Sequence, residues 1–350
     1  MLDKYDPSTY NHQYAKINGI RMHYVDENKS SSKALLLIHG WPDLWIGWRE
    51  QIAFLAELGY RVIVPSLRGF GETDGPADPA EYGFGTISND LVGLLDHLEI
   101  PTVTVIGHDW GGAVTWRFGQ FYPNRVRALA SFCTPYTAPA KQDVTLEQIV
   151  QVLPNFKYQL YLNTPEAEKD INENVGKFFR RIFRPVTDMA GQPMIDPKTG
   201  KLAEGRPDRP RSEKVPEKVM DYYIEWYTKQ GARGGLNWYK QTHNNFVQCK
   251  DLDPIIRKPS MMVIAELDKA LPPSMATKMP DFIPGVKMHF VAGSGHWILW
   301  EKPDECNKFL KDFLAEVDPI TSNKLNAEPF YFQYKRFGSE YDCWVANEQV

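Results

Sequence analysis

Short runs of apolar, largely β-branched residues alternate with amphipathic segments through the first 135 residues of the chain. Runs of this kind, bounded by Gly, Pro and Asp, predict buried strands, and here they are residues 34–38, 61–64, 103–106 and 128–132. Amphipathic patterns predict helices over 48–58 and 87–98. This alternation is typical of a mostly parallel sheet with crossover helices.

The same alternation returns after residue 250, with strands expected at 260–264 and 287–291 and a last helix over 303–317. Residues 136–250 lack strong strand runs but contain aromatic helical patterns such as MDYYIEWY at 220–227. We therefore expect a doubly wound α/β core in two parts, 1–135 and 251–320, interrupted by a helical lid, or cap, at 136–250.

Two segments depart from this plan. Residues 184–215 are dense in Pro, Gly and charge, which predicts a long surface loop with a small hairpin at 196–200. The tail 321–350 is too aromatic for a solvated terminus. We expect it to pack either on the core or on a second copy of the chain in a homodimer.

Composition excludes several classes of function. The 350 residues carry 40 Lys and Arg against 44 Asp and Glu, with no block of like charge, so nucleic acid is not an expected partner. No apolar stretch approaches the roughly 18 residues of a membrane span, and the first residues lack the pattern of a secretory signal. We expect a cytoplasmic protein. Its four scattered cysteines predict thiols rather than a zinc site or disulfide framework.

A candidate nucleophile follows the strand expected at 103–106. The sequence there is Gly107-His108-Asp109-Trp110-Gly111-Gly112, and a helical pattern begins at residue 113. Small residues two before and two after a central residue suit a sharp strand-to-helix turn, where a neighbouring Cβ would clash. The central residue is Asp109. The alternative is that Asp109 only caps the helix, a role that aspartate often fills.

Three other motifs favour the catalytic interpretation. His39-Gly40-Trp41-Pro42 follows the first strand, where an oxyanion-hole loop is expected; His39 itself fits a structural hydrogen-bonding role better. Gly293-Ser294-Gly295-His296-Trp297 puts a histidine on a loop after the last strand, and Ala265-Glu266-Leu267-Asp268 offers it a carboxylate. Asp109, Asp268 and His296 then follow the order nucleophile, acid, base. Glu266 remains an alternative to Asp268.

The ordered set of motifs resembles the soluble epoxide hydrolase family of the α/β-hydrolase fold. From about residue 17 to 317 the resemblance runs through HGWPD, RGFGETD, GHDWGG, YQLY, LNWY, AELD and GHW. It implies Asp109 as nucleophile, His296 as base, Asp268 as its partner, and Tyr158 and Tyr239 as lid tyrosines. The implied reaction adds water to an apolar epoxide to give a vicinal diol, with no metal or other cofactor.

Each implied residue type suits that chemistry. A carboxylate that opens an epoxide forms an ester, which water can cleave when His296 removes its proton and Asp268 orients the imidazole. The N–H groups of Trp41 and Trp110 would stabilise the tetrahedral intermediate of that cleavage, by roughly 3–4 kcal/mol per donor.

Ring opening also needs a donor to the alkoxide, and a phenol with a pKa near 10 remains protonated at neutral pH. Tyr158 and Tyr239 are the candidates, although they could be ordinary packing residues, and Tyr161 and Tyr227 are the substitutes. The lid pocket is expected to favour apolar epoxides, and its expected lining residues are Trp41, Trp110, Phe156, Leu162 and Trp297.

Two alternatives remain open. Haloalkane dehalogenases share the fold and the Asp nucleophile, but the tyrosine pair and the absence of an Asn at position 41 favour an epoxide. A non-catalytic receptor that kept the pocket would predict erosion of the catalytic set, which is intact here. Asp at position 109 argues against serine esterases, and Trp110 argues against fluoroacetate-type dehalogenases.

Overall fold

Eight strands form one mixed sheet in the computed structural model of the chain, which describes residues 2–188, 196 and 208–320. The strand order is β1-β2-β4-β3-β5-β6-β7-β8. β2 runs antiparallel to both β1 and β4, and all other neighbours are parallel. The strands are β1 His12–Ile17, β2 Ile20–Glu27, β3 Ala34–Ile38, β4 Arg61–Pro65, β5 Val103–His108, β6 Val126–Phe132, β7 Ser260–Ala265 and β8 Lys287–Val291.

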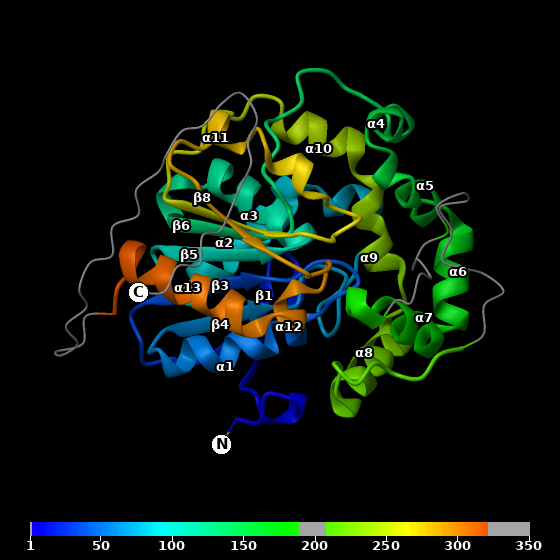
Figure 1. Ribbon diagram of the computed structural model, residues 1–350, viewed down its shortest axis with the longest axis horizontal. Helices are drawn as coiled ribbons and strands as arrows, with labels where there is room; N and C mark the ends of the chain where they lie inside the picture. Colours follow the sequence, from blue (N-terminus) through cyan, green and yellow to red (C-terminus); the bar gives the residue numbers. More distant parts are fainter. Residues whose placement is uncertain (1, 189–195, 197–207, 321–350) are drawn as a thin grey trace. The chain divides into compact units, whose positions relative to one another are not determined.

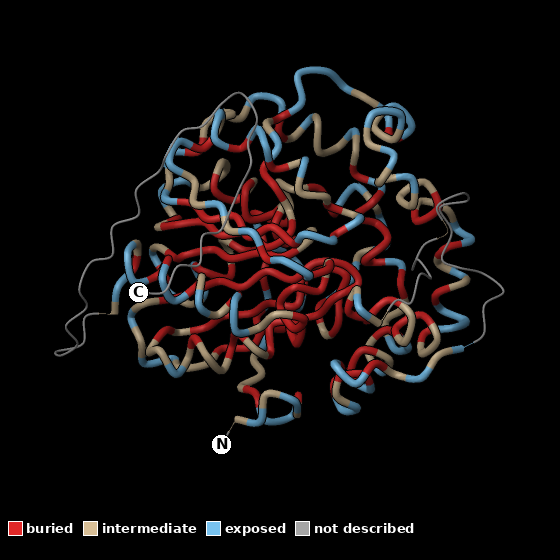
Figure 2. Tube along the Cα trace, viewed as in Figure 1, coloured by how far each residue is buried: buried red, intermediate tan, exposed pale blue. Residues whose placement is uncertain are grey.

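The central strands are buried on both faces, which explains their unbroken apolar runs. Every residue of β3, β5 and β7 is buried, whereas the edge strand β8 alternates between more and less exposed positions. Figure 2 shows this buried centre as a band of red. The predicted strands 34–38, 61–64, 103–106, 128–132, 260–264 and 287–291 all coincide with these elements to within two residues at each end.

The hairpin of β1 and β2 was not among the elements predicted from the sequence. Asn18 and Gly19 join the two strands, both with positive φ, of 46° and 84°. An Asn-Gly pair between alternating segments is the strongest local signal for a two-residue hairpin turn. The signal was therefore present in HQYAKI-NG-IRMHYV, but this polar-rich pattern lacks the apolar run of a central strand.

Helices cover both faces of the sheet. α1 packs against α12 and α13, while α2 packs against α3, and Figure 1 shows these two groups on different sides of the sheet. α2 and α3 each begin three residues earlier than predicted, and α3 starts directly after Asp109. The core helices are α1 Arg49–Glu57, α2 Phe84–His97, α3 Trp110–Phe121, α11 Met279–Phe282, α12 Ile298–Glu301 and α13 Pro303–Val317.

A helical segment lies between β6 and β7, within the range 136–250 that we expected to form the cap (Figure 1). The predicted pattern 220–227 falls inside α8. Most of the loop 184–215 lies outside the described residues, including all of the predicted hairpin 196–200 except Asp196, and so does the tail 321–350. The cap helices are α4 Leu146–Val152, α5 Tyr158–Leu162, α6 Pro165–Glu173, α7 Val175–Ile182, α8 Glu217–Gln230, α9 Arg233–Asn237 and α10 Thr242–Cys249.

The described residues of core and cap belong to one compact unit that ends at Ile320. Among the helices of the described residues, none combines the length and the apolar character that a bilayer crossing requires.

Candidate active site

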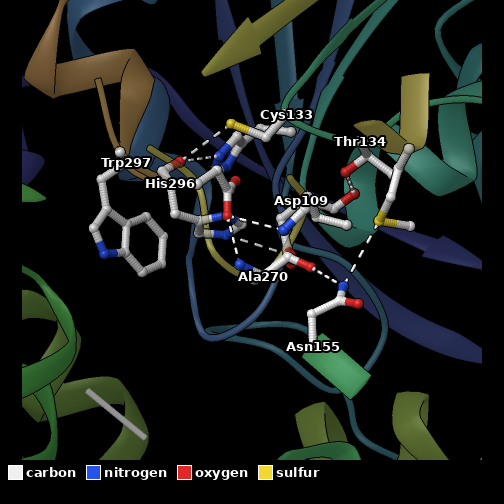
Figure 3. Close-up of polar contacts among 12 residues, drawn as sticks. Asp109, Cys133, Thr134, Asn155, Ala270, His296 and Trp297 are labelled. Atoms are coloured by element: carbon white, nitrogen blue, oxygen red, sulfur yellow. Dashed lines mark hydrogen bonds and ion pairs between the residues drawn. The ribbon is translucent and has the colours of Figure 1, made fainter. Parts of the chain in front are cut away.

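Asp109 occupies a strained turn between β5 and α3. β5 ends at His108, α3 begins at Trp110, and Asp109 between them has φ 53° and ψ −125°. A non-glycine residue in this region of backbone space is held there by its surroundings, and such strain is concentrated at functional sites. The side chain of Asp109 thus projects from the carboxyl end of the central strand (Figure 3).

The flanking glycines allow this turn because neighbouring backbone comes very close. A Cβ on Gly107 would lie 2.1 Å from the carbonyl oxygen of Gly111, and a Cβ on Gly111 would lie 2.0 Å from that of Ile38. Neither position has room for a side chain. The motif predicted small residues at 107 and 111, and steric exclusion by the neighbouring backbone is the reason.

Two loops bring a histidine and a carboxylate to Asp109. His296 follows β8, and its Nε2 lies 3.5 Å from Asp109 Oδ2. Its Nδ1 lies 2.7 Å from Asp268 Oδ2, and Asp268 follows β7. Glu266, the alternative acid, instead accepts a hydrogen bond from the Gly293 N–H. The structure therefore brings Asp268, and not Glu266, against His296.

The charges around His296 change its proton affinity. Burial alone would lower the pKa of His296, but the carboxylates of Asp268 and Asp109 outweigh burial and raise this pKa well above 6.5. Burial alone would raise the pKa of Asp268, but His296 and the N–H groups of Leu271 and Ala270 hold it below 3.8. The free site thus favours an imidazolium between two carboxylates.

A backbone donor faces the other oxygen of Asp109. The Trp41 N–H donates a 2.8 Å hydrogen bond to Asp109 Oδ1. This approach needs Gly40, because a Cβ there would lie 2.3 Å from that oxygen. Trp110 contributes the first N–H of α3, and helix geometry leaves such a group without an intrahelical acceptor.

Tyr158 and Tyr239 border the same cavity as Asp109, a space of about 440 Å³ between core and cap. Tyr158 begins α5, and Tyr239 lies in the short 3₁₀ helix Trp238–Lys240. Their ring centroids are 6.2 Å apart. Burial is the main cause that raises the pKa of each phenol, and the negative charge of Asp109 adds to it, so both remain protonated at neutral pH.

The substitute tyrosines do not border this cavity. The Tyr161 hydroxyl donates to Asp170 instead. Tyr227 lies 4.8 Å from Phe179, measured between ring centroids, in an edge-on contact within the cap. Of the four tyrosines that the sequence analysis named, only Tyr158 and Tyr239 reach the space in front of Asp109.

Two of the five residues expected to line a substrate pocket border this cavity. Phe156 and Trp110 border the cavity, but Trp41, Leu162 and Trp297 are not among its lining residues. Leu162 is buried inside the cap. The Trp297 indole points away from Asp109 (Figure 3) and donates a 2.6 Å hydrogen bond to the Ile182 carbonyl. Adjacency in sequence to a catalytic residue does not fix the direction of a side chain.

The cavity wall is instead built mainly from apolar residues that no motif marked. They come from helices distant in sequence, so only the packing of the cap on the core brings them together. Representative lining residues are Phe84, Leu146, Ile149, Leu153, Phe246 and Met275.

Glu301 is a buried residue of the site that the sequence analysis also missed. Its carboxylate accepts 3.0 Å hydrogen bonds from the N–H groups of Gly295 and Trp297, the two neighbours of His296. It also accepts a 3.3 Å bond from the N–H of Val186, which belongs to the cap insertion. Burial raises the pKa of this carboxyl. Glu301 therefore holds the loop of His296 from both sides and links it to the cap.

The backbone of His296 itself is held by two further side chains. The His108 Nε2–H donates a 2.8 Å hydrogen bond to the His296 carbonyl, and the Cys133 thiol lies 3.4 Å from the same oxygen. Burial lowers the pKa of His108 to about 4 and raises that of Cys133, so neither group is charged at neutral pH. Their part in the site is to fix the loop.

His39 and three cysteines behave as structural groups. The Leu67 N–H donates to His39 Nε2 at 3.1 Å, and His39 Nδ1–H donates to the Gly40 carbonyl at 2.9 Å. Cys133, Cys249 and Cys306 are buried free thiols. Burial raises the pKa of each, which disfavours the reactive thiolate.

Comparison with known proteins agrees with the fold. A family model described as alpha/beta hydrolase fold matches residues 33–303. The bifunctional epoxide hydrolase 2 of Mus musculus is 37% identical over 328 residues, which cover 91% of this chain and 58% of that protein. The chain thus spans little more than half the length of this relative. Epoxide hydrolase srdG of Neurospora crassa is 32% identical over 339 residues, with 90% and 98% covered.

Among solved structures, epoxide hydrolase A from Mycobacterium thermoresistibile superposes with a TM-score of 0.78 at 27% sequence identity. The match covers 89% of this chain and 99% of that one. The similarity therefore includes the cap insertion as well as the core.

Proposed function

Because the chain belongs to the epoxide hydrolases of the α/β-hydrolase fold, we propose that it adds water to an apolar epoxide and releases a vicinal diol. The observation that carries this proposal is the position of Asp109. Its carboxylate lies between the Trp41 N–H and His296. It also borders one apolar cavity together with two protonated phenols.

In the first step the epoxide lies in the cavity with its oxygen toward Tyr158 and Tyr239. Asp109 Oδ2 attacks a ring carbon, the carbon–oxygen bond of the epoxide breaks, and one phenol donates its proton to the departing alkoxide. The product is an ester on Asp109. A high phenol pKa suits this role, because the developing alkoxide is a still stronger base.

In the second step water attacks Cγ of that ester, and His296 takes the proton of the water. Oδ1 becomes the oxyanion, and the Trp41 N–H already points at it. Collapse of the tetrahedral intermediate breaks the Cγ–Oδ2 bond. Oδ2, which is now bonded to the substrate carbon, leaves as the second hydroxyl after it takes a proton from the imidazolium. One oxygen of the water stays in the Asp109 carboxyl group, and the proton of that group passes to His296, which restores the carboxylate and the imidazolium.

The charges explain why His296 acts only in the second step. In the free site two carboxylates raise its pKa, which favours the imidazolium. Alkylation removes the negative charge of Asp109, so the pKa of His296 falls. The imidazolium then gives up its proton, which restores the phenol that donated to the alkoxide, and the neutral ring becomes a competent base. Asp268 keeps the Nδ1–H oriented throughout.

Haloalkane dehalogenation is the second candidate function. The buried Trp41 Nε1 has no hydrogen-bond partner among the described residues, and indole N–H groups can stabilise a leaving halide, but Trp41 does not line the cavity. A halide needs no proton, however, whereas an alkoxide does. The two tyrosines on the cavity therefore favour the epoxide reaction.

The test is intact mass spectrometry of a His296→Gln variant after exposure to a panel of epoxides and haloalkanes. Loss of the base traps the ester, so we expect an adduct with the full mass of an epoxide, located on Asp109 by peptide mapping. An adduct lighter than its haloalkane by HX would favour dehalogenation.

His243→Gln is the matched control, since His243 is an exposed histidine outside the cavity; it should accumulate no adduct. Asp109→Ala combined with His296→Gln should also remain unmodified. No adduct from either class, together with an inactive wild type, would overturn the proposed hydrolase activity.

A further inference from the structure

A second cluster of titratable side chains lies outside the proposed active site. It consists of His12 on β1, His23 on β2 and Glu72 in the loop after β4. His12 Nδ1 lies 2.7 Å from His23 Nε2, and Glu72 Oε1 lies 4.0 Å and 3.8 Å from these two nitrogens. None of the three residues lines the cavity in front of Asp109.

The triangle of these three atoms is close to the dimensions of a metal site. A point equidistant from its corners lies about 2.1 Å from each atom, and zinc is bound by histidine nitrogen and carboxylate oxygen at roughly 2.0–2.2 Å. Because this point lies in the plane of the three atoms, tetrahedral coordination requires the two imidazole nitrogens to move slightly apart and the ion to lie outside that plane. We propose that His12, His23 and Glu72 form a binding site for a divalent transition metal of the zinc class.

The outer nitrogens of both imidazoles are already oriented. His12 Nε2 lies 2.8 Å from the Pro7 carbonyl, which can only accept, so the hydrogen of a neutral His12 sits there and Nδ1 offers a lone pair. His23 Nδ1 lies 2.9 Å from the Ser66 hydroxyl, which accepts a hydrogen equally well. Metal-binding histidines are typically held in this way by their second nitrogen.

The ion would take the place of the hydrogen between the two imidazoles, and no proton has to leave the site. At 2.7 Å one hydrogen fits between His12 Nδ1 and His23 Nε2. When the ion enters, His23 carries its hydrogen on Nδ1 toward Ser66 and presents the Nε2 lone pair to the metal. The tautomer changes, and no net proton is released.

Hydrogen bonds also hold the Glu72 carboxylate in place. The Tyr14 hydroxyl donates to Glu72 Oε2, and the Tyr222 hydroxyl from α8 of the cap donates to Oε1 at 3.0 Å. The Trp45 indole packs edge-on against His12 and donates a 2.7 Å hydrogen bond to Tyr222. The side chains of His12 and Glu72 remain 24% and 11% exposed, which leaves a path for the ion and a position for water.

The two imidazoles and one carboxylate favour zinc over magnesium or calcium, which prefer oxygen ligands. Neither the spacing of the cysteines nor the family resemblance predicted a metal. These ligands are 11 and 49 residues apart in the chain, and they meet only because β2 pairs with both β1 and β4.

The test is calorimetric titration of the dialysed full chain with Zn²⁺ alone, together with metal analysis after gel filtration. We expect one ion per chain in the wild type. His12→Gln and Glu72→Gln should each weaken binding by about 100-fold or more, and Tyr14→Phe by about 10-fold, as is usual for a residue that holds a ligand. His243→Gln, a change at an exposed histidine, should leave the affinity unchanged.

Cobalt binding distinguishes this site from a second possible site at the Cys133 thiol beside His296. Co²⁺ bound by His12, His23 and Glu72 should show d–d absorption without a thiolate charge-transfer band. Zinc binding that survives His12→Gln and Glu72→Gln, binding lost in His296→Gln, or no binding by the wild type would each overturn the proposal. Tyr14→Phe changes an exposed side chain, so the comparison remains decisive even if a ligand variant fails to fold.

Discussion

The backbone N–H of Trp41 donates a 2.8 Å hydrogen bond to Asp109 Oδ1, and this contact makes the two carboxylate oxygens inequivalent. Oδ2 faces His296 instead. Under the proposed mechanism, Oδ2 bonds to the substrate and Oδ1 becomes the carbonyl oxygen of the ester. The water then attacks the carbon between them.

A single turnover in H₂¹⁸O should therefore label the enzyme rather than the diol. We expect one ¹⁸O in the peptide that contains Asp109, as measured by mass spectrometry after proteolysis. Asp109→Ala should lower turnover by at least about 10⁴-fold, because it removes the nucleophile. Label found in the diol after the first turnover would mean that water attacks the epoxide directly.

The tyrosine pair should control formation of the ester. Tyr158→Phe and Tyr239→Phe should each slow single-turnover alkylation by roughly 10²-fold or more, because an alkoxide without a proton donor leaves poorly. The double variant should be slower still. Tyr161→Phe is the matched control, since the hydroxyl of Tyr161 contacts Asp170 rather than the cavity. Unchanged alkylation in the double variant would contradict the assigned role.

Asp268 and Glu266 should differ in the hydrolysis step. Asp268→Asn should slow decay of the ester by about 10²–10⁴-fold, because His296 loses its orienting carboxylate. Glu266→Gln should change the decay rate little, since Glu266 contacts the Gly293 N–H. Rapid-quench measurement of ester decay distinguishes the effects of the two substitutions. An equal effect of both would contradict the assignment of Asp268 as the partner of His296.

The ion pair of His296 and Asp268 predicts how the stability of the fold depends on pH. The raised pKa of His296 means that its contribution is fully present below pH 6.5 and is lost as pH rises through that pKa. The lowered pKa of Asp268 means that its contribution is present above pH 3.8 and is lost as pH falls through that pKa.

Denaturant unfolding across this range should therefore show the largest stability difference between wild type and Asp268→Asn from about pH 4 to 6.5. The difference should decline at higher pH, as His296 loses its proton. A difference that grows steadily with pH would contradict the assigned direction of the His296 shift.

Glu301 should act as a positioning residue. Glu301→Gln puts an amide NH₂ where a carboxylate oxygen now accepts from N–H groups, so a donor faces donors on the His296 loop. We expect kcat to fall by about 10-fold through slower ester decay, with little change in the rate of alkylation. Glu301→Asp should restore part of the rate. Equal slowing of both steps would indicate a general loss of structure instead.

Sequence patterns predicted the core well because each buried strand carries its own signal. The runs of β3, β5 and β7 are apolar throughout, since helices cover both faces of the sheet. The β1–β2 hairpin escaped because its signal is a turn, Asn18-Gly19, rather than an apolar run.

The amino-acid sequence by itself determined the order of the buried strands from β3 to β8 and the place of Asp109 on a sharp turn, because apolar runs and small flanking residues leave little choice there. Tertiary structure alone decided which acid meets His296, which side chains line the cavity, and that His12, His23 and Glu72 converge. These relations depend on where loops from different strands end and on the direction of each side chain. Neither is encoded by the spacing of residues along the chain.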